Sequence, residues 1–123
     1  GGGVGWFFID EVCATTREND LTRIGNGIPA VVQIHDPECP RCRALQREAR
    51  DAMSNFKENE LQYLVANVRL AKGRQLATRH GVGHVTLLLF DGKGNRRGIL
   101  AGPNTSAYLE SVFRNHLVRV PRK

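Results

Sequence analysis

Two thiols stand two residues apart in the segment Asp36-Pro37-Glu38-Cys39-Pro40-Arg41-Cys42, between a short apolar run and an amphipathic one. This position predicts that the thiols lie at the start of a helix, and Pro40 suits its first turn, where no N–H partner is lost. Helix N–H groups and the positive dipole end favour a thiolate and can lower a cysteine pKa from about 8.5 to roughly 3.5 to 7.5. We therefore expect Cys39 to attack as a nucleophile and Cys42 to resolve the product.

The cysteine count excludes a secreted disulfide framework. The 123 residues contain three cysteines, and Cys39 and Cys42 are too close in sequence to close a stabilising loop. Cys13 would remain an odd thiol, and we interpret it as a small buried hydrophobe. The pair at positions 39 and 42 therefore indicates redox or metal chemistry.

The charge pattern gives little support for a nucleic-acid partner. Eighteen basic and twelve acidic residues give a formal net charge of +6, mostly from arginines spread along the chain. Arg43, Arg47 and Arg50 alternate with Glu48 and Asp51 at helical spacings, which is typical of a solvated helix face. RNA-binding aromatic motifs, zinc-finger spacing and unbroken Lys/Arg runs do not occur, so we expect no nucleic-acid binding.

The beginning of the chain leaves two interpretations open. It starts with Gly1-Gly2-Gly3 rather than Met, so we expect a natural N-terminus that has been processed, trimmed or replaced. We predict that residues 1–15 form a lead-in, in which the apolar patch Val4 to Ile9 is either a first strand or the exit from a removed anchor or signal. No apolar run approaches the roughly 20 residues of a membrane span, so we expect the chain as given to be soluble. We favour an extracytoplasmic location, periplasmic and membrane-anchored, with the cytoplasm as the alternative.

Residues 16–123 have the pattern of one α/β domain, large enough to need no disulfide staples. Strands are predicted by short β-branched or apolar runs, and helices by apolar residues at spacings of three and four. In chain order we expect a strand at Gly5 to Ile9, a weak polar helix at Thr16 to Ile24, a strand at Ala30 to Ile34, a helix from Pro40 to about Lys57, a strand at Leu61 to Asn67, a helix at Gly73 to His80, strands at Val85 to Phe90 and Arg97 to Ala101, and a helix from Thr105 or Ser106 to about Val118. The early alternation predicts parallel strands with crossover helices, and the late hairpin adds an antiparallel edge.

Three features together carry a resemblance to a known family. They are the strand that runs into Cys39-Pro40-Arg41-Cys42, the stretch from Gly81 to Phe90, and Gly102 before the last helix. Over nearly its whole length the chain resembles the thioredoxin-like family. The resemblance implies a thioredoxin fold, with a central mixed β-sheet flanked by helices on both faces. It also implies a monomeric thiol-disulfide oxidoreductase that needs no cofactor and exchanges disulfides with protein substrates and a redox partner, through an exposed Cys39 and a buried Cys42.

The chain departs from the family pattern at three positions. Where the family commonly carries a buried carboxylate that moves a proton from the second Cys, this chain has Gln33, which takes up no proton at neutral pH. The family's cis-proline position is occupied by Val85, where a cis bond would cost about 3 to 4 kcal/mol, so we expect a trans bond. The substrate groove, predicted at His84, Val85 and Thr86, should therefore be reshaped. Glu38 replaces the aromatic residue that often precedes the first Cys.

Opposing charges are predicted to tune the Cys39 thiol. Glu38 and Asp36 raise a thiol pKa, whereas Arg41, Arg43, a protonated His35 and the helix dipole lower it. The helix N–H groups are fixed and close, while the carboxylates are expected to be solvated. We predict a lowered pKa on balance.

Two alternatives to an enzyme remain open. The pair is either idle on a scaffold used for protein interaction, or it binds a metal together with His80 and His84, whose spacing of four residues is zinc-like. His35 and His84 also have ordinary roles, as a packing residue at a strand end and as a solvent-facing loop residue.

Overall fold

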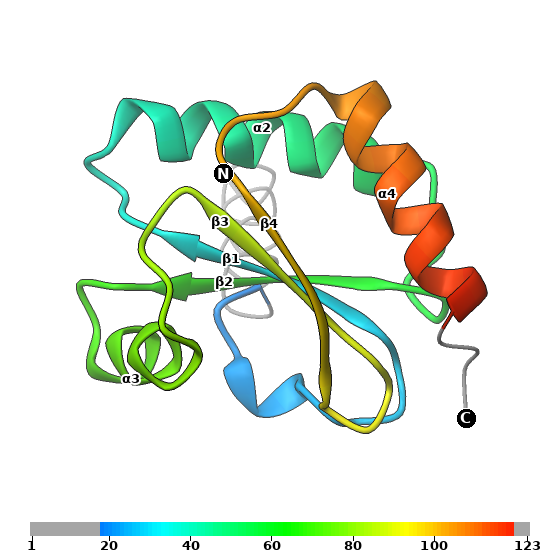
Figure 1. The fold of residues 1–123 in the computed structure, drawn as a ribbon, viewed down its shortest axis with the longest axis horizontal. Helices are drawn as coiled ribbons and strands as arrows, with labels where there is room; N and C mark the ends of the chain where they lie inside the picture. Colours follow the sequence, from blue (N-terminus) through cyan, green and yellow to red (C-terminus); the bar gives the residue numbers. More distant parts are fainter. Residues whose placement is uncertain (1–17, 120–123) are drawn as a thin grey trace, which may run out of the picture.

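The computed structural model describes residues 18–119, which form a four-stranded sheet with helices on both faces (Figure 1). In chain order the elements are the 3-10 helix η1 (Leu21–Arg23), β1 (Ala30–His35), α2 (Pro40–Met53), β2 (Gln62–Asn67), α3 (Ala71–His80), β3 (Thr86–Phe90), β4 (Arg96–Ala101) and α4 (Ser106–Arg119). The strand predicted at residues 5–9, the lead-in and Cys13 lie outside the described residues. Within residues 18–119 no helix is both long and apolar enough to cross a membrane.

The sheet has the strand order β2-β1-β3-β4. The α2 crossover makes β1 and β2 parallel, with Ala30 opposite Gln62 and His35 opposite Asn67. β3 runs antiparallel to β1, and β4 runs antiparallel to β3. The sheet is therefore mixed, as expected. The parallel pairing predicted for the alternating elements is found between β1 and β2, whereas β3, which follows the next helix, is antiparallel to β1 and does not fit that prediction.

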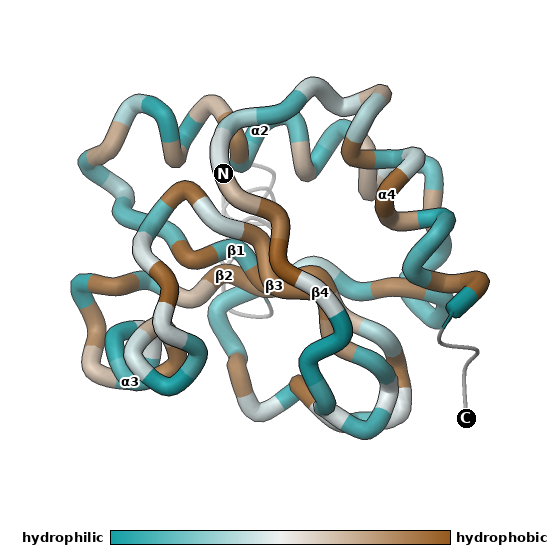
Figure 2. Tube along the Cα trace, in the orientation of Figure 1, coloured by the Kyte–Doolittle hydropathy of each residue, from teal (hydrophilic) through white to brown (hydrophobic). Residues whose placement is uncertain are grey.

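Alternate residues of the strands fill two separate cores. α2 and α4 cover one face, and α3 covers the other together with η1 (Figure 1). Side chains that point to α2 and α4 include Val31, Tyr63, Val65, Leu87 and Leu89. Their neighbours along each strand point to α3. This period of two is that of strands buried on both faces, and Figure 2 shows the hydrophobic residues concentrated along the central strands.

Helix α2 is positioned by its cap and by one apolar stripe. Cys39 is the N-cap residue and Pro40 occupies the first turn, as predicted. Cys42, Leu45 and Ala49 recur at spacings of three and four and are buried against the sheet. The helix ends at Met53, before the predicted Lys57, because the Ser54 hydroxyl donates to the carbonyl of Asp51 at 2.6 Å and replaces a helical bond.

The α3 region differs from the prediction at the start of the helix and at the start of the following strand, whereas the helix ends at His80 as predicted. The helix begins at Ala71, and its buried Gly73 lies so close to the end of β2 that a Cβ there would be 2.0 Å from the Asn67 carbonyl oxygen. Its C-cap residue is Gly81, which has a φ of 65°. β3 begins at Thr86 rather than Val85, because Val85 has a φ of 60°, in the left-handed region that strands exclude.

In the described part of the polar helix predicted at residues 16–24, the short 3-10 helix η1 occurs instead of a continuous α-helix. The Asp20 carboxylate accepts a hydrogen bond from the Thr22 N–H at 3.1 Å, which caps this single turn.

Candidate functional site

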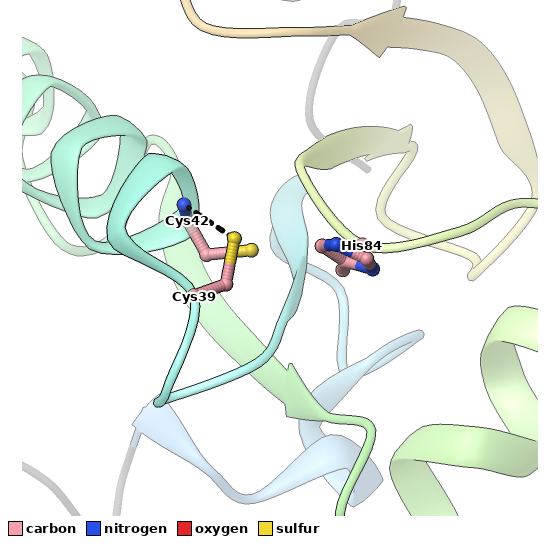
Figure 3. A group of neighbouring side chains, drawn as sticks. All are labelled: Cys39, Cys42 and His84. Carbon is pink, nitrogen blue, oxygen red and sulfur yellow. Dashed lines mark hydrogen bonds between the residues drawn. The ribbon is translucent and has the colours of Figure 1, made fainter.

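The two cysteines of the site lie at the first turn of α2, and both are free thiols (Figure 3). Cys39 is partly exposed, whereas Cys42 is fully buried in the apolar stripe of the helix. The backbone N–H of Cys42 donates to Cys39 Sγ at 3.3 Å, so one otherwise unpaired helix donor points at this sulfur. The pair thus places an accessible sulfur next to a sequestered one.

The pKa values of the two thiols move in opposite directions. The pKa of Cys39 lies below its ordinary value, chiefly because the Cys42 side chain hydrogen-bonds to it and also because the backbone N–H of Cys42 does. The backbone N–H of Arg41 has the same effect. Burial raises the pKa of Cys42, and the hydrogen bond with Cys39 adds to this increase. Cys39 is therefore the sulfur that ionises first.

His84 faces the cysteine pair from the loop before β3. Both Sγ atoms and a ring nitrogen of His84 all lie within 4.8 Å of one another, and His84 is exposed (Figure 3). The structure thus brings together three of the four residues that the sequence analysis considered as a metal site.

The other two residues of the predicted groove, Val85 and Thr86, are buried. The described residues contain no cis peptide bond, so the bond before Val85 is trans, as predicted. Both backbone polar groups of Val85 are used internally: its N–H donates to the Ile34 carbonyl at 3.1 Å, and its carbonyl accepts from the Gly102 N–H at 2.9 Å. His84 is therefore the accessible part of this segment.

Gln33 lies fully buried behind Cys42. Its amide Nε2 donates to the Cys42 carbonyl at 2.9 Å, and its Oε1 accepts a hydrogen bond from the Tyr63 hydroxyl at 2.6 Å. The amide fixes the start of α2 against β1, and it takes up no proton at neutral pH.

His35 is buried at the end of β1, where its Nδ1 lies 3.1 Å from Gln33 Nε2. Burial lowers the pKa of this imidazole, so the ring is neutral at neutral pH and carries no positive charge to Cys39. This environment supports a packing role for His35 and not the stabilisation of the Cys39 thiolate.

Arg69 is a functional candidate that the sequence analysis missed. It binds Asp36 at 2.8 Å and Glu38 at 3.5 Å, so both carboxylates beside the cysteines have the same cationic partner. The hydrogen bond from Arg69 is also the largest cause of the lowered pKa of Asp36. β1 and β2 are parallel, and His35 at the end of β1 lies opposite Asn67 at the end of β2. Asp36 and Arg69 follow these two strand ends, which explains why they are in contact.

Among the described residues, the side chains grouped closely enough to hold a metal ion are Cys39, Cys42 and His84. His80 is not a member of this group. Its ring contacts Phe90 edge-on, with 5.4 Å between the ring centroids. Of the two histidines with zinc-like spacing, only His84 therefore joins the cysteines.

The comparisons with known proteins identify the fold. The sequence matches no protein-family model and no curated protein. Among solved structures, an uncharacterised thioredoxin-like protein from Clostridium perfringens is 19% identical, with a TM-score of 0.66 over 83% of this chain and 81% of that one. Trxlp from Edwardsiella tarda is 18% identical, with a TM-score of 0.62 over 75% and 87% of the two chains. Thioredoxin O2 from Arabidopsis thaliana, in its oxidised state, is 18% identical, with a TM-score of 0.58 over 87% and 86%.

The chain therefore has an α/β thioredoxin-like fold, as the sequence predicts. Within that fold it carries a CxxC pair at the first turn of α2.

Proposed function

We propose that the protein is a thiol-disulfide oxidoreductase that acts on protein disulfides. The observation that carries this proposal is the Cys39 sulfur, which is partly exposed, has a lowered pKa and lies at the helix N-cap beside the buried Cys42. A thiolate is the nucleophile of disulfide exchange, and access decides which thiolates react.

In the reducing direction the exchange has two steps. The Cys39 thiolate attacks one sulfur of a substrate disulfide, forms a mixed disulfide and expels the other substrate sulfur as a thiolate. Cys42 then loses its proton and attacks Cys39 Sγ, which closes the Cys39–Cys42 disulfide and expels the second substrate thiolate. Two electrons pass from the pair to the substrate, and the reverse sequence oxidises a dithiol.

The second step is the slower one in this proposal. Burial raises the pKa of Cys42, and the Gln33 amide behind it accepts no proton. The proton of Cys42 must therefore leave by another path, and mixed disulfides should persist longer than they would beside a buried carboxylate.

Insulin reduction with a thiol donor tests the activity. The wild-type chain should reduce insulin, and Cys39→Ser should abolish the reduction because the nucleophile is lost. Cys42→Ser should trap a mixed disulfide at Cys39, from which the natural protein partner can be identified by mass spectrometry. An inactive wild-type chain that traps no partner would instead favour a non-catalytic interaction module.

A further inference from the structure

Cys39, Cys42 and His84 provide a donor set that fits a metal ion as well as a redox reaction. The two sulfurs and a ring nitrogen lie within 4.8 Å of one another, and they come from two separate segments of the chain (Figure 3). Bond lengths of about 2.3 Å for Zn–S and 2.0 to 2.1 Å for Zn–N would place tetrahedral ligand atoms about 3.6 to 3.8 Å apart. Metal binding therefore requires the three ligand atoms to lie about 1 Å or less closer together than the 4.8 Å limit.

The neighbouring carboxylates add no ligand to this donor set of two sulfurs and one nitrogen. The carboxylates of Asp36 and Glu38, which precede Cys39 in the sequence, are bound by Arg69 at 2.8 and 3.5 Å. Neither belongs to the group around the sulfurs. Thiolate and imidazole ligands in tetrahedral geometry select zinc over hard cations such as magnesium and calcium.

The residue that follows His84 has an unusual backbone conformation. Val85 is a β-branched residue with a φ of 60°, an unfavourable conformation that surrounding structure must hold in place. Its side chain is buried in the same core as Cys42, and its N–H and carbonyl are bonded to Ile34 and Gly102. With Val85 fixed inward, the side chain before it in sequence lies at the surface beside the cysteines.

We propose that the reduced protein binds one Zn²⁺ per chain through Cys39 Sγ, Cys42 Sγ and a ring nitrogen of His84. The fourth position is left for water or an external ligand, because Cys39 and His84 are both accessible to solvent. Binding releases the proton of each thiol that is still protonated, and no electron is transferred.

Metal binding and disulfide formation exclude each other, because both use the same two sulfurs. Attack on a disulfide substrate by the zinc-bound pair transfers two electrons to that substrate, forms the Cys39–Cys42 bond and releases Zn²⁺. The ion would therefore protect the reduced pair and compete with its substrates. This consequence depends on the proposed oxidoreductase activity, whereas the binding itself needs only the reduced pair, so the two proposals can fail separately.

Zinc competition tests the site directly. The full chain, reduced with a non-thiol phosphine under anaerobic conditions, is titrated with ZnCl₂ against a chromophoric chelator. We expect one Zn²⁺ per chain, and an affinity at least about tenfold weaker in His84→Ala, since even outer partners of metal ligands contribute 10- to 100-fold. His80→Ala is the matched control and should keep the wild-type affinity, because His80 contacts Phe90 rather than the cysteines.

Titration with CoCl₂ reports the ligands independently of affinity. Wild type should show thiolate-to-cobalt charge transfer and the intense visible bands of a tetrahedral ion, and His84→Ala should weaken the visible bands. Four results would each overturn the proposal: no competition with the chelator, unchanged affinity in His84→Ala, one zinc per two chains, or an iron–sulfur chromophore in the purified protein. None of these readouts measures disulfide exchange.

Discussion

At the scale of single residues, the reactivity of Cys39 depends on hydrogen bonds that converge on its sulfur. The Cys42 side chain is the largest cause of its lowered pKa, followed by the backbone N–H of Cys42. We expect the alkylation rate of reduced wild type by iodoacetamide to have a midpoint below the value of about 8.5 for a free cysteine. Cys42→Ala should raise that midpoint, because the side-chain donor is lost.

Cys42→Ser is the control for this prediction, since its hydroxyl can still donate to the Cys39 thiolate. Its midpoint should remain closer to that of wild type than the midpoint of Cys42→Ala. A wild-type midpoint at or above that of a free thiol would contradict the assignment of Cys39 as the nucleophile.

Arg69 acts on the same sulfur through the carboxylates that it binds. The negative charge of Asp36 raises the pKa of Cys39, and Arg69 offsets that charge from 2.8 Å. Arg69→Gln should therefore raise the alkylation midpoint, and the increase should shrink in high salt because these groups are exposed. Arg74→Gln is a suitable control, because the Arg74 guanidinium donates to the Arg69 carbonyl and not to a carboxylate. Equal midpoints in wild type and Arg69→Gln would show that solvent already screens Asp36.

At the scale of elements, the contact of α3 with β2 tolerates no side chain at position 73. A Cβ on Gly73 would lie 2.0 Å from the Asn67 carbonyl oxygen, a backbone atom that cannot move without shifting the strand end. Gly73→Ala should therefore reduce the free energy of unfolding by about 2 kcal/mol or more, as overpacking commonly does. Gly83→Ala is the matched control, since a Cβ added at Gly83 would meet nothing within 4 Å. Urea denaturation compares the two, and equal losses would argue against close packing of α3.

The positive φ of Val85, in the turn that leads into β3, predicts an unusual order of stability for substitutions at this position. An alanine at this position keeps the penalty of the left-handed conformation, about 1 to 2 kcal/mol, whereas a glycine does not. Both substitutions remove the two buried γ-methyl groups of Val85, and glycine lacks Cβ as well. Val85→Gly should therefore be more stable than Val85→Ala in urea denaturation, the reverse of the order found in regular helices and strands. The usual order would mean that residue 85 does not keep a positive φ in solution.

At the scale of the whole molecule, periodicity was enough to predict most of the elements. The stripe of Leu45, Ala49 and Ala52 predicts α2, and the apolar run before Asp91 predicts β3. Element ends were less accurate, because they depend on single contacts such as the Ser54 hydroxyl bonding to the Asp51 carbonyl. Such side-chain bonds compete with the hydrogen bonds of the helix, but they leave the hydrophobic periodicity of the sequence unchanged.

The site could be predicted only in part, because half of it depends on tertiary placement. Cys39 and Cys42 are close together in the sequence, and their position at a helix start follows from the pattern alone. His80 and His84 are equivalent by spacing, but the helix ends at His80, so only the second histidine reaches the cysteines. Arg69 lies 33 residues from Asp36, and only the pairing of β1 with β2 brings them together.

The two buried histidines predict how the stability of the whole fold depends on pH. His35 and His116 are almost completely buried, and burial lowers the pKa of each. The ring of His116 also hydrogen-bonds to the Phe90 carbonyl at 2.9 Å, from α4 to the end of β3. In the unfolded chain these imidazoles take up protons as the pH falls through about 6.5, while in the folded chain they remain neutral. Stability should therefore begin to fall below about pH 6.5.

The loss of stability approaches a slope of about 1.4 kcal/mol per pH unit for each histidine. It stops once the pH is below the pKa of that histidine in the folded chain. Urea denaturation between pH 7.5 and 5 measures it, in a Cys39→Ser background so that ionisation of Cys39 does not contribute to the pH dependence. The carboxylates of Asp36 and Asp91 have lowered pKa values, so their contributions are lost only at more acidic pH. His116→Gln keeps a donor for the Phe90 carbonyl but does not titrate, and it should make the slope shallower. If the slope were the same in this variant, protonation of His116 would not be coupled to unfolding.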